Sequence, residues 1–355
     1  MMISTSLLLL LSLLLSITII CNSHSDNIHI NHNNIAIGIQ GKVSSLNEWI
    51  NVYRLMKKHN NNISLFLLSY DNILYNCDND IICIYKPNST WTSGRNNLLI
   101  SIYNNEEIIG SIYKYILFAD SDMLYVNCDE MSLSFNKDEG AAFCLNRFIQ
   151  MYLLSSISFA QVSFLGKLSR PNEFYKFDCP DAKFVAFHHA AVPILLPYVE
   201  KLDNMSWWES QRILWRVASG CIPFSSIGSG MLGDENIINE HASYPKTQSI
   251  ERLSQVIKDV YGKFGLTPNP IDDSQFNTVQ GDCANQENMI LNRQNRPPNS
   301  IPNYYTNTNN KYRRLQFDNA TIELSEKWRN TNEYHYCLSK LKVRYHQYVK
   351  NRILD

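Results

Sequence analysis

The chain has no excess of charge of either sign and no basic stripe. Its 32 Lys and Arg residues balance 33 Asp and Glu residues, so the formal net charge is −1. Nucleic-acid-binding surfaces need clustered positive charge, and nucleic acid is therefore not an expected partner. The sequence also lacks the Gly-X-Ser-X-Gly motif of α/β-hydrolases and the His-Glu-X-X-His motif of zinc proteases. These absences disfavour a hydrolase of either class.

After residue 24, no segment of the sequence is apolar enough to span a bilayer. Before it, the run from Leu7 to Ile20 is almost unbroken Leu, Ile and Ser, but it is shorter than the roughly 20 residues of a spanning helix. The residues from Cys21 to His24 are small or polar and suit cleavage. We predict that residues 1–24 are a secretory signal. A cleaved signal peptide is the first interpretation, and a short signal anchor of a type II Golgi membrane protein is the second.

The sequence has no Cys-X-X-Cys pair, which disfavours zinc ribbons and thioredoxin chemistry. Eight of its nine cysteines follow the signal, and an even number permits a full set of disulfides in the lumen of the ER or Golgi or after secretion. The pairing cannot be read from the sequence, although Cys77 and Cys83 can close a short local loop. Four Asn-X-Ser/Thr sequons fit glycosylation in the same compartment; they begin at Asn62, Asn88, Asn204 and Asn319.

Short apolar runs alternate with helical patterns in the first part of the mature chain. The order β-α-β-β-α-β predicts an α/β fold whose mostly parallel sheet is flanked by helices. The strands are expected at residues 35–40, 63–70, 81–85 and 113–119. One helix is expected from a cap at Ser45 to about residue 58, and a second from a cap at Thr92 or Ser93 to about residue 112.

The later part of the chain gives weaker signals. Residues 140–145 and 182–186 are expected to be strands, residues 206–218 a helix and residues 228–230 a loop. Asn, Pro and Tyr dominate residues 267–310, which indicates a long wrapping segment, and residues 333–352 are expected to form a final helix. We therefore predict one domain over residues 35–247, followed by an irregular C-terminal extension over residues 248–355.

The fourth predicted strand ends in two aspartates. The run Tyr113-Lys114-Tyr115-Ile116-Leu117-Phe118-Ala119 is followed by Asp120, Ser121 and Asp122. Open α/β sheets bind their ligands outside the carboxyl ends of the strands. Two carboxylates at i and i+2 can share one Mg²⁺ or Mn²⁺ ion, which keeps positions open for phosphate oxygens. The pattern indicates a site for a metal–diphosphate, and an ordinary Asp-Ser-Asp turn is the alternative.

The order of these elements resembles the GT-A nucleotide-sugar glycosyltransferase superfamily over roughly residues 35–245. The resemblance is carried by Ser93-Gly94-Arg95-Asn96-Asn97-Leu98 at a helix start, which precedes Phe118-Ala119-Asp120-Ser121-Asp122, with 25 residues between Arg95 and Asp120. The start Thr90-Trp91-Thr92-Ser93-Gly94-Arg95-Asn96 is also similar to protist and algal glycosyltransferase-like proteins. The resemblance implies a GT-A (Rossmann-like) sheet, a nucleotide-diphospho-sugar donor, Mn²⁺ or Mg²⁺, and a glycan, protein or lipid acceptor.

The resemblance also implies roles for single residues at the metal and the nucleotide. Asp122 would bind the metal directly, and Asp120 would bind the metal, the ribose or both. A late histidine completes the metal site in several members, and His241 is the candidate here, with a surface-loop histidine as the alternative. Asp71 ends the second strand, where it would contact the nucleotide base or ribose or would serve as an ordinary turn residue.

Two further expectations concern the diphosphate and the base. The resemblance places Arg95 and Asn96 beside the diphosphate, at a helix start that favours anions; for Arg95, a surface position or a structural ion pair is the alternative. An inverting transferase needs a base for the acceptor hydroxyl. Asp203 and Glu209 are the candidates, and Asp203 is preferred because Glu209 also completes a Ser-X-X-Glu capping box.

The histidines at 188 and 189 follow an apolar strand, and we expect one of them to face the site. The predicted function is a luminal, metal-dependent glycosyltransferase. The alternative is a secreted, non-catalytic sugar- or nucleotide-binding protein that keeps the fold.

Overall fold

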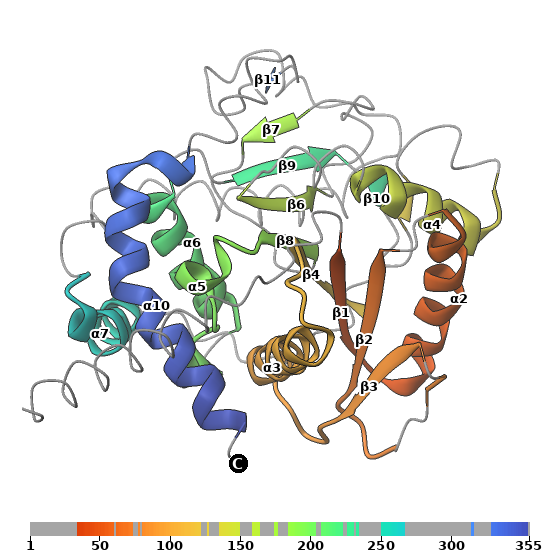
Figure 1. The fold of residues 1–355 in the computed structure, drawn as a ribbon, viewed down its shortest axis with the longest axis horizontal. Coiled ribbons are helices and arrows are strands. Elements are labelled where there is room, and N and C mark those ends of the chain that lie inside the picture. Colours follow the sequence, from red (N-terminus) through yellow and green to blue (C-terminus); the bar gives the residue numbers. More distant parts are fainter. Residues whose placement is uncertain are drawn as a thin grey trace, which may run out of the picture.

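The structure, a computed structural model, describes the chain in segments that together form an α/β fold. The described residues are 34–59, 62–73, 77–78, 80–121, 126–127, 135–149, 158–163, 174–176, 184–203, 207–222, 226–230, 232–233, 250–266, 314–315 and 328–353. Figure 1 shows a central sheet with helices on both of its faces. The predicted α/β class is therefore confirmed, and the sheet is compatible with a Rossmann-like fold.

Nine described strands form the main sheet in the order β11-β7-β9-β6-β8-β4-β1-β2-β3. The neighbours from β3 to β4 pair in parallel, whereas β8 is antiparallel to both β4 and β6. The predicted parallel character is thus found in the β3-β2-β1-β4 half of the sheet and again in the pair of β6 and β9. The strands are β1 Ile35–Gly41, β2 Ile63–Ser69, β3 Ile81–Tyr85, β4 Tyr115–Asp120, β6 Phe159–Ser163, β7 Phe174–Lys176, β8 Phe184–His188, β9 Ser226–Gly230 and β11 Arg314–Leu315, and a separate pair joins β5 Val126–Asn127 to β10 Leu232–Gly233.

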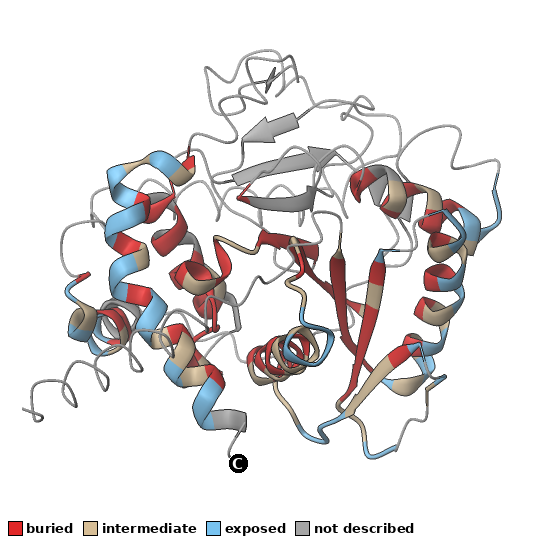
Figure 2. Ribbon diagram, viewed as in Figure 1, coloured by how far each residue is buried: buried red, intermediate tan, exposed pale blue. Residues whose placement is uncertain are grey.

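Strands β1, β4 and β8, in the middle of the sheet, are buried along their whole length, as Figure 2 shows. Every residue of β1, β4 and β8 is buried, because helices cover both faces of this part of the sheet. Successive side chains of a strand point to opposite faces. Ile37 and Ile39 accordingly pack into one hydrophobic cluster, and Ala36 packs into the other.

The two clusters identify the helices on each face. α2 and α4 share a cluster with Ile37, whereas α3, α5, α6, α7 and α10 share the cluster with Ala36. Figure 1 shows α2 and α4 together on one side of β1 and β2, with α3, α5 and α10 on the other side. The helices are α2 Val43–His59, α3 Trp91–Ile109, α4 Lys137–Phe148, α5 Val192–Leu195, α6 Trp207–Cys221, α7 Ile250–Tyr261 and α10 Asn332–Ile353, and the short 3-10 helices are η5 Glu200–Leu202, η6 Gly262–Phe264 and η8 Trp328–Asn330.

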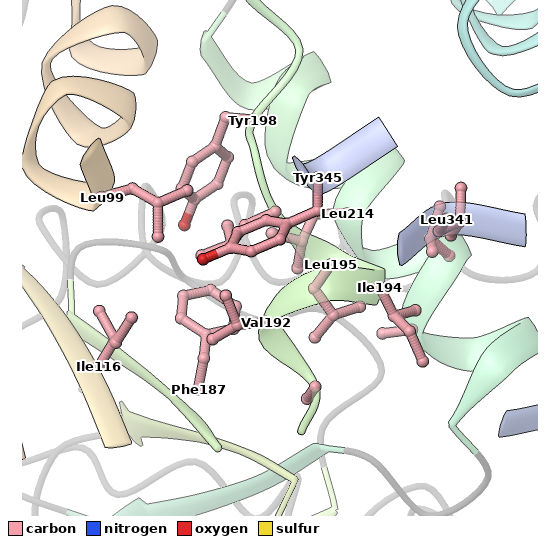
Figure 3. Close-up of a cluster of buried hydrophobic side chains, with 14 of the residues drawn as sticks. Leu99, Ile116, Phe187, Val192, Ile194, Leu195, Tyr198, Leu214, Leu341 and Tyr345 are labelled. Atoms are coloured by element: carbon pink, nitrogen blue, oxygen red, sulfur yellow. The ribbon is translucent and has the colours of Figure 1, made fainter. Parts of the chain in front are cut away.

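Helix α10 packs into the core of the preceding residues. Its buried side chains recur at helical spacing, at Tyr334, Cys337, Leu341, Tyr345 and Val349. Figure 3 shows Leu341 and Tyr345 of α10, which belong to the same cluster as Leu99 of α3 and Phe187 of β8. The predicted final helix is therefore confirmed, and the described end of the C-terminal extension shares one core with the predicted domain.

Of the two described disulfides, one joins the pair of cysteines that the sequence spacing indicated. Cys77 and Cys83 are bonded, with Cα atoms 5.9 Å apart, and this pair closes the short loop that the spacing allowed. Cys221 of α6 is bonded to Cys337 of α10, with Cα atoms 5.6 Å apart. The predicted signal lies outside the described residues. None of the helices in the described part of the chain has the length and apolarity that a bilayer crossing requires.

Two of the expected elements are wrong. Residues 140–145 belong to helix α4, because Asn136 caps its start by accepting the Glu139 N–H (3.0 Å) and because Asp138 and Glu139 lie in its first turn, where negative charge stabilises a helix. A short apolar run cannot by itself distinguish a strand from a helix. Residues 228–230 form the end of strand β9 and not a loop, since they pair with β6.

Candidate functional site

The carboxyl ends of β1 and β4 lie side by side. The connections along the chain run from β1 in one direction across the sheet and then return to β4 on the other side of β1. Gln40, near the end of β1, is the register partner of Asp120, the last residue of β4. This position is the topological switch point, outside which open α/β sheets bind ligands.

The first turn of α3 packs closely against the end of β1. The Gln40 side-chain amide donates to the Thr90 carbonyl (Nε2–O 3.1 Å). A Cβ atom on Gly94 would lie 2.4 Å from Gln40 Cδ, so a larger residue here would displace the Gln40 side chain. Gly94 therefore leaves room for the Gln40 side chain that joins the end of β1 to the start of α3.

The N-terminus of α3 is capped by residues of its own chain segment. Thr90 Oγ1 accepts the Ser93 N–H (3.1 Å), and Ser93 Oγ accepts the Thr90 N–H (2.8 Å), which together form a capping box. The cap thus precedes the expected Thr92 or Ser93, and Ser93 takes the reciprocal position. The helix ends at Gly110, whose φ of 60° lies in the left-handed region that favours glycine.

Asp120 is bound from α3 by two donors. Its Oδ1 accepts from Arg95 Nη2 (2.5 Å) and from Trp91 Nε1 (2.9 Å). The side chain of Asp120 keeps 11% of its surface exposed, whereas that of Arg95 is fully buried. α3 therefore fixes the orientation of the carboxylate at the end of β4.

Arg95 is held inside the fold between two aromatic rings. Its guanidinium carbon lies 5.1 Å from the Trp91 ring centroid and 5.5 Å from that of Phe118. A buried arginine requires a paired negative charge, and Asp120 supplies it. Of the alternatives that the sequence allowed for Arg95, the observed contact is a structural ion pair, and a contact with a diphosphate stays a prediction.

Asn96 connects α3 to the segment after α5. Its side chain donates to the Tyr198 carbonyl (3.0 Å) and to Glu200 Oε1 (2.8 Å), and its Oδ1 accepts the Tyr198 N–H (2.9 Å). These bonds satisfy the hydrogen-bonding groups of the buried Asn96 amide without a ligand. The predicted role of Asn96 at the diphosphate stays a prediction.

Tyr198 is itself part of the buried polar group near Asp120. Its ring packs edge-on against Trp91, with centroids 5.2 Å apart. Burial raises the pKa of the Tyr198 hydroxyl, while Arg95 lowers it and Asp120 raises it further. The hydroxyl therefore stays protonated and is available as a donor at any physiological pH.

Asp203 lies against the start of α3. The Thr90 hydroxyl donates to Asp203 Oδ2, and the residue is 9% exposed. Burial raises the pKa of Asp203, and the negative charge of Glu200 adds to this, whereas the nearby hydroxyls of Thr90 and Thr92 lower it. A raised pKa brings a carboxylate closer to the range in which it can exchange protons near neutrality.

Several buried polar atoms around the start of α3 have no hydrogen-bond partner among the described residues. They are Gln40 Oε1, Ser89 Oγ, Thr92 Oγ1, Arg95 Nε, Arg95 Nη1, the Tyr198 hydroxyl and Asp203 Oδ1. Buried polar atoms in folded proteins are nearly always hydrogen-bonded. A group of such atoms at the switch point therefore fits a site that completes its bonding with a polar ligand.

Asp71, by contrast, stabilises the start of a different helix. Its Oδ2 accepts the Val43 N–H (3.0 Å), and its Oδ1 accepts from the Ser69 hydroxyl. Partial burial raises the pKa of Asp71, but these hydrogen bonds more than offset it, so the pKa lies below its usual value. The bond to Val43 also explains why α2 begins before the expected cap at Ser45. A contact with the nucleotide stays a prediction.

Of the remaining candidates, the structure describes only Glu209. Glu209 is buried in the first turn of α6, but Ser206, its expected capping partner, lies outside the described residues. Asp122 and His241 also lie outside them. Among the residues that the structure does describe, no group of three or more His, Cys, Asp or Glu side chains is arranged to hold a metal ion.

The paired histidines lie at the wrong end of the sheet for the site. His188 is the register partner of Tyr115, the first residue of β4, which places it roughly 16 Å along the strand from Asp120. Burial and the nearby positive charges lower the pKa of His188 to about 2, and its Nδ1 accepts the Ala190 N–H (3.1 Å). His188 is structural, and the expectation that this segment faces the Asp120 site is wrong.

Sequence reasoning missed the residues that hold the site together. Trp91 belongs to the motif at the start of α3, but the motif does not indicate that its side chain binds Asp120. The polar Gln40 near the end of an apolar strand is a local signal of the site. Tyr198 and Glu200 gave no local signal. A comparison with models of known protein families finds no match for the chain, and a comparison with curated protein sequences finds none either.

Proposed function

We propose that this protein is a luminal, metal-dependent glycosyltransferase that moves a sugar from a nucleotide-diphospho-sugar to a glycan, protein or lipid acceptor. The observation that carries the proposal is the group of buried, unpartnered polar atoms beside Asp120 at the switch point. The β3-β2-β1-β4 order and the resemblance to GT-A enzymes support the same scaffold. The two described disulfides support an oxidising compartment.

The donor would bind at the carboxyl ends of β1 and β4. The positive end of the α3 dipole favours an anionic diphosphate there. The Tyr198 hydroxyl and the free N–H groups of Arg95 are donors that fit polar oxygens, and Gln40 Oε1 is an acceptor. Arg95 contributes chiefly by positioning Asp120, because its charge is already paired.

The proposed metal would be held by Asp120 together with Asp122 and His241. Asp120 suits this role, since its carboxylate oxygens are hard ligands and its side chain keeps some exposure. When bound, Mn²⁺ or Mg²⁺ would supply Lewis-acid stabilisation of the departing diphosphate. Asp203 would take the acceptor hydroxyl proton if the transfer inverts the anomeric centre, with Glu209 as the second candidate.

One observation favours the non-catalytic alternative. Asp120 is neutralised by Arg95 and its Oδ1 accepts two hydrogen bonds, so its attraction for a metal ion is weaker than that of an unpaired carboxylate. In that case the protein would bind a sugar or nucleotide without turning it over.

Turnover of UDP-sugars with and without Mn²⁺ separates the two functions. A transferase should release UDP with Mn²⁺, lose activity with EDTA and recover on addition of Mn²⁺. Asp120→Asn should abolish turnover while its thermal melt stays cooperative. Binding of UDP by calorimetry without turnover of any donor would support the alternative, and failure to bind any nucleotide, nucleotide-sugar or sugar would refute both.

A further inference from the structure

The segment that carries Asp203 is held by three separate helices. Asn96 of α3 binds the backbone of Tyr198, and Ser210 of α6 accepts the Val199 N–H (3.1 Å). Arg344 of α10 donates to the Pro197 carbonyl (Nη2–O 2.7 Å). The backbone from 197 to 199 is therefore fixed before the short helix η5 begins.

Glu200 joins two of these helices directly in front of Asp203. Its Oε1 accepts from Asn96 Nδ2 (2.8 Å) and from the Tyr348 hydroxyl of α10 (2.6 Å). The Asp203 N–H in turn donates to the Glu200 carbonyl (3.0 Å), which closes one turn of η5. A shift of the Glu200 side chain would move the backbone that presents Asp203.

We propose that Glu200, held by Tyr348 and Asn96, is a positioning residue for Asp203, and that helix α10 is thereby part of the construction of the site. This inference rests on the proposed function in one respect, since it takes Asp203 as the proton acceptor. The C-terminal helix would fix the distance between Asp203 and the first turn of α3, where Thr90 binds Asp203 Oδ2.

The charges around Asp203 make the inference testable. The groups that act on its carboxyl are the hydroxyls of Thr90 and Thr92 and the backbone of Ser93, all at the start of α3, and the carboxylate of Glu200. Glu200 is the one charged group among them, and its effect is to raise the pKa of Asp203. Removing this charge while keeping the shape should lower that pKa.

Two substitutions separate position from charge. Glu200→Gln keeps an oxygen that can accept from Asn96 and Tyr348 but removes the charge. Tyr348→Phe keeps the charge but removes one of the two bonds that hold it. Tyr336→Phe is the matched control, because it also removes one tyrosine hydroxyl bond of α10, to the Gly265 carbonyl (2.9 Å), far along the helix from Glu200.

The measurements are kcat, donor KM, the pH profile of kcat and the thermal melt, on the full mature protein. We expect Tyr348→Phe to lower kcat by about 10- to 100-fold, as expected of a misplaced reacting group, with donor KM unchanged. Tyr336→Phe should keep the wild-type kcat. We expect Glu200→Gln to move the acidic limb of the kcat profile to lower pH. Equal kcat in the two tyrosine variants, with both folded, would overturn the inference.

A measurement without turnover keeps the inference separate from the proposed function. In protein labelled with ¹³C at aspartate carboxyls, the Asp203 signal is assigned by its loss in Asp203→Asn and is titrated in wild type and Glu200→Gln. A lower midpoint in Glu200→Gln supports the coupling even if no donor is turned over, in which case the proposed function alone fails. An unchanged midpoint in Glu200→Gln refutes the coupling. This titration does not depend on Tyr348→Phe, so it decides the question even if that variant does not fold.

Discussion

The starts of α2 and α3 lie on the two faces of the same sheet, and the carboxylates beside them differ in exposure and in the direction of their pKa shift. At α2, Asp71 is partly exposed, binds the first helical N–H through Val43 and has a lowered pKa. At α3, the helix caps itself with Thr90, while Asp203 is buried with a raised pKa. Among the described residues of these two helix starts, buried side-chain atoms without a hydrogen-bond partner occur only at α3. The first arrangement is complete without a ligand, and the second is not.

The largest expected effect is the loss of turnover when a proposed metal ligand is removed. Asp122→Ala should abolish Mn²⁺-dependent UDP-sugar turnover and leave the fold intact, because a carboxylate is lost from a hard-ion site. Asp78→Ala is the matched control on the α2 side, since Asp78 forms an exposed ion pair with Arg54, and exposed pairs contribute little. Wild-type turnover and wild-type metal dependence in Asp122→Ala would show that the Asp-X-Asp assignment is wrong.

The next effect concerns the base. Asp203→Asn should lower kcat by about 10²- to 10⁴-fold with little change in UDP affinity, as expected for the loss of a general base. Glu209→Gln should lower thermal stability modestly and leave kcat near that of wild type, if capping is its role. Steady-state kinetics and calorimetry with UDP check both. Normal turnover in both variants would favour a retaining mechanism.

The third prediction compares the stability contributed by the two carboxylate contacts. Arg95→Met leaves the buried Asp120 carboxylate without its ion-pair partner, which typically costs about 3–5 kcal/mol. Asp71→Ala removes a helix-capping carboxylate, which typically costs about 0.5–2 kcal/mol. Urea unfolding at pH 7 measures both. Equal losses would mean that the Arg95–Asp120 pair is more hydrated than its burial indicates.

The smallest effect is on the pH dependence of stability, to which Asp71 and Asp203 should contribute with opposite sign. The pKa of Asp71 is lowered from 3.8, so its stabilisation is present above the unfolded-state value and is lost as the pH falls through the folded-state value. The pKa of Asp203 is raised from 3.8, so stability falls as the pH rises from that value through the folded-state value.

Urea unfolding between pH 3 and pH 8 therefore distinguishes the two sites. Relative to wild type, Asp71→Asn should lose stability at neutral pH and less of it at pH 3. Asp203→Asn should gain stability as the pH rises, with no gain at pH 3. The same sign for both variants would contradict the contrast between the two helix starts.

The parts of the fold that could be predicted are those whose signal is local. Unbroken apolar runs marked β1, β2 and β4, and the spacing of Trp49, Val52 and Met56 marked the buried face of α2. Residues 140–145 form a helix and not the expected strand, because their short apolar run fits either element and the helix is decided by the cap at Asn136. The antiparallel position of β8 depends on long-range pairing, which no local pattern encodes.

The candidate site was predictable only in outline. The position of Asp120 at the end of β4 follows from an apolar run that stops at a carboxylate. Its binding by Arg95, by contrast, depends on how α3 packs on β1, where the Gln40 side chain lies against Gly94. The bond between Thr90 and Asp203 joins residues 113 positions apart. Contacts of this kind follow from the tertiary fold and not from sequence spacing.

The bond between Cys221 and Cys337 has a consequence for how the chain can vary. It ties together two residues that are 116 positions apart, so it removes a large share of the freedom of the unfolded chain, on the order of 4–5 kcal/mol in the entropic account. The cost of closing such a loop grows only with the logarithm of its length, and doubling it adds about 0.6 kcal/mol. Insertions or deletions between the two cysteines, in segments outside β9, β10, α7 and β11, should therefore be tolerated while α10 stays docked against the segment that leads to Asp203.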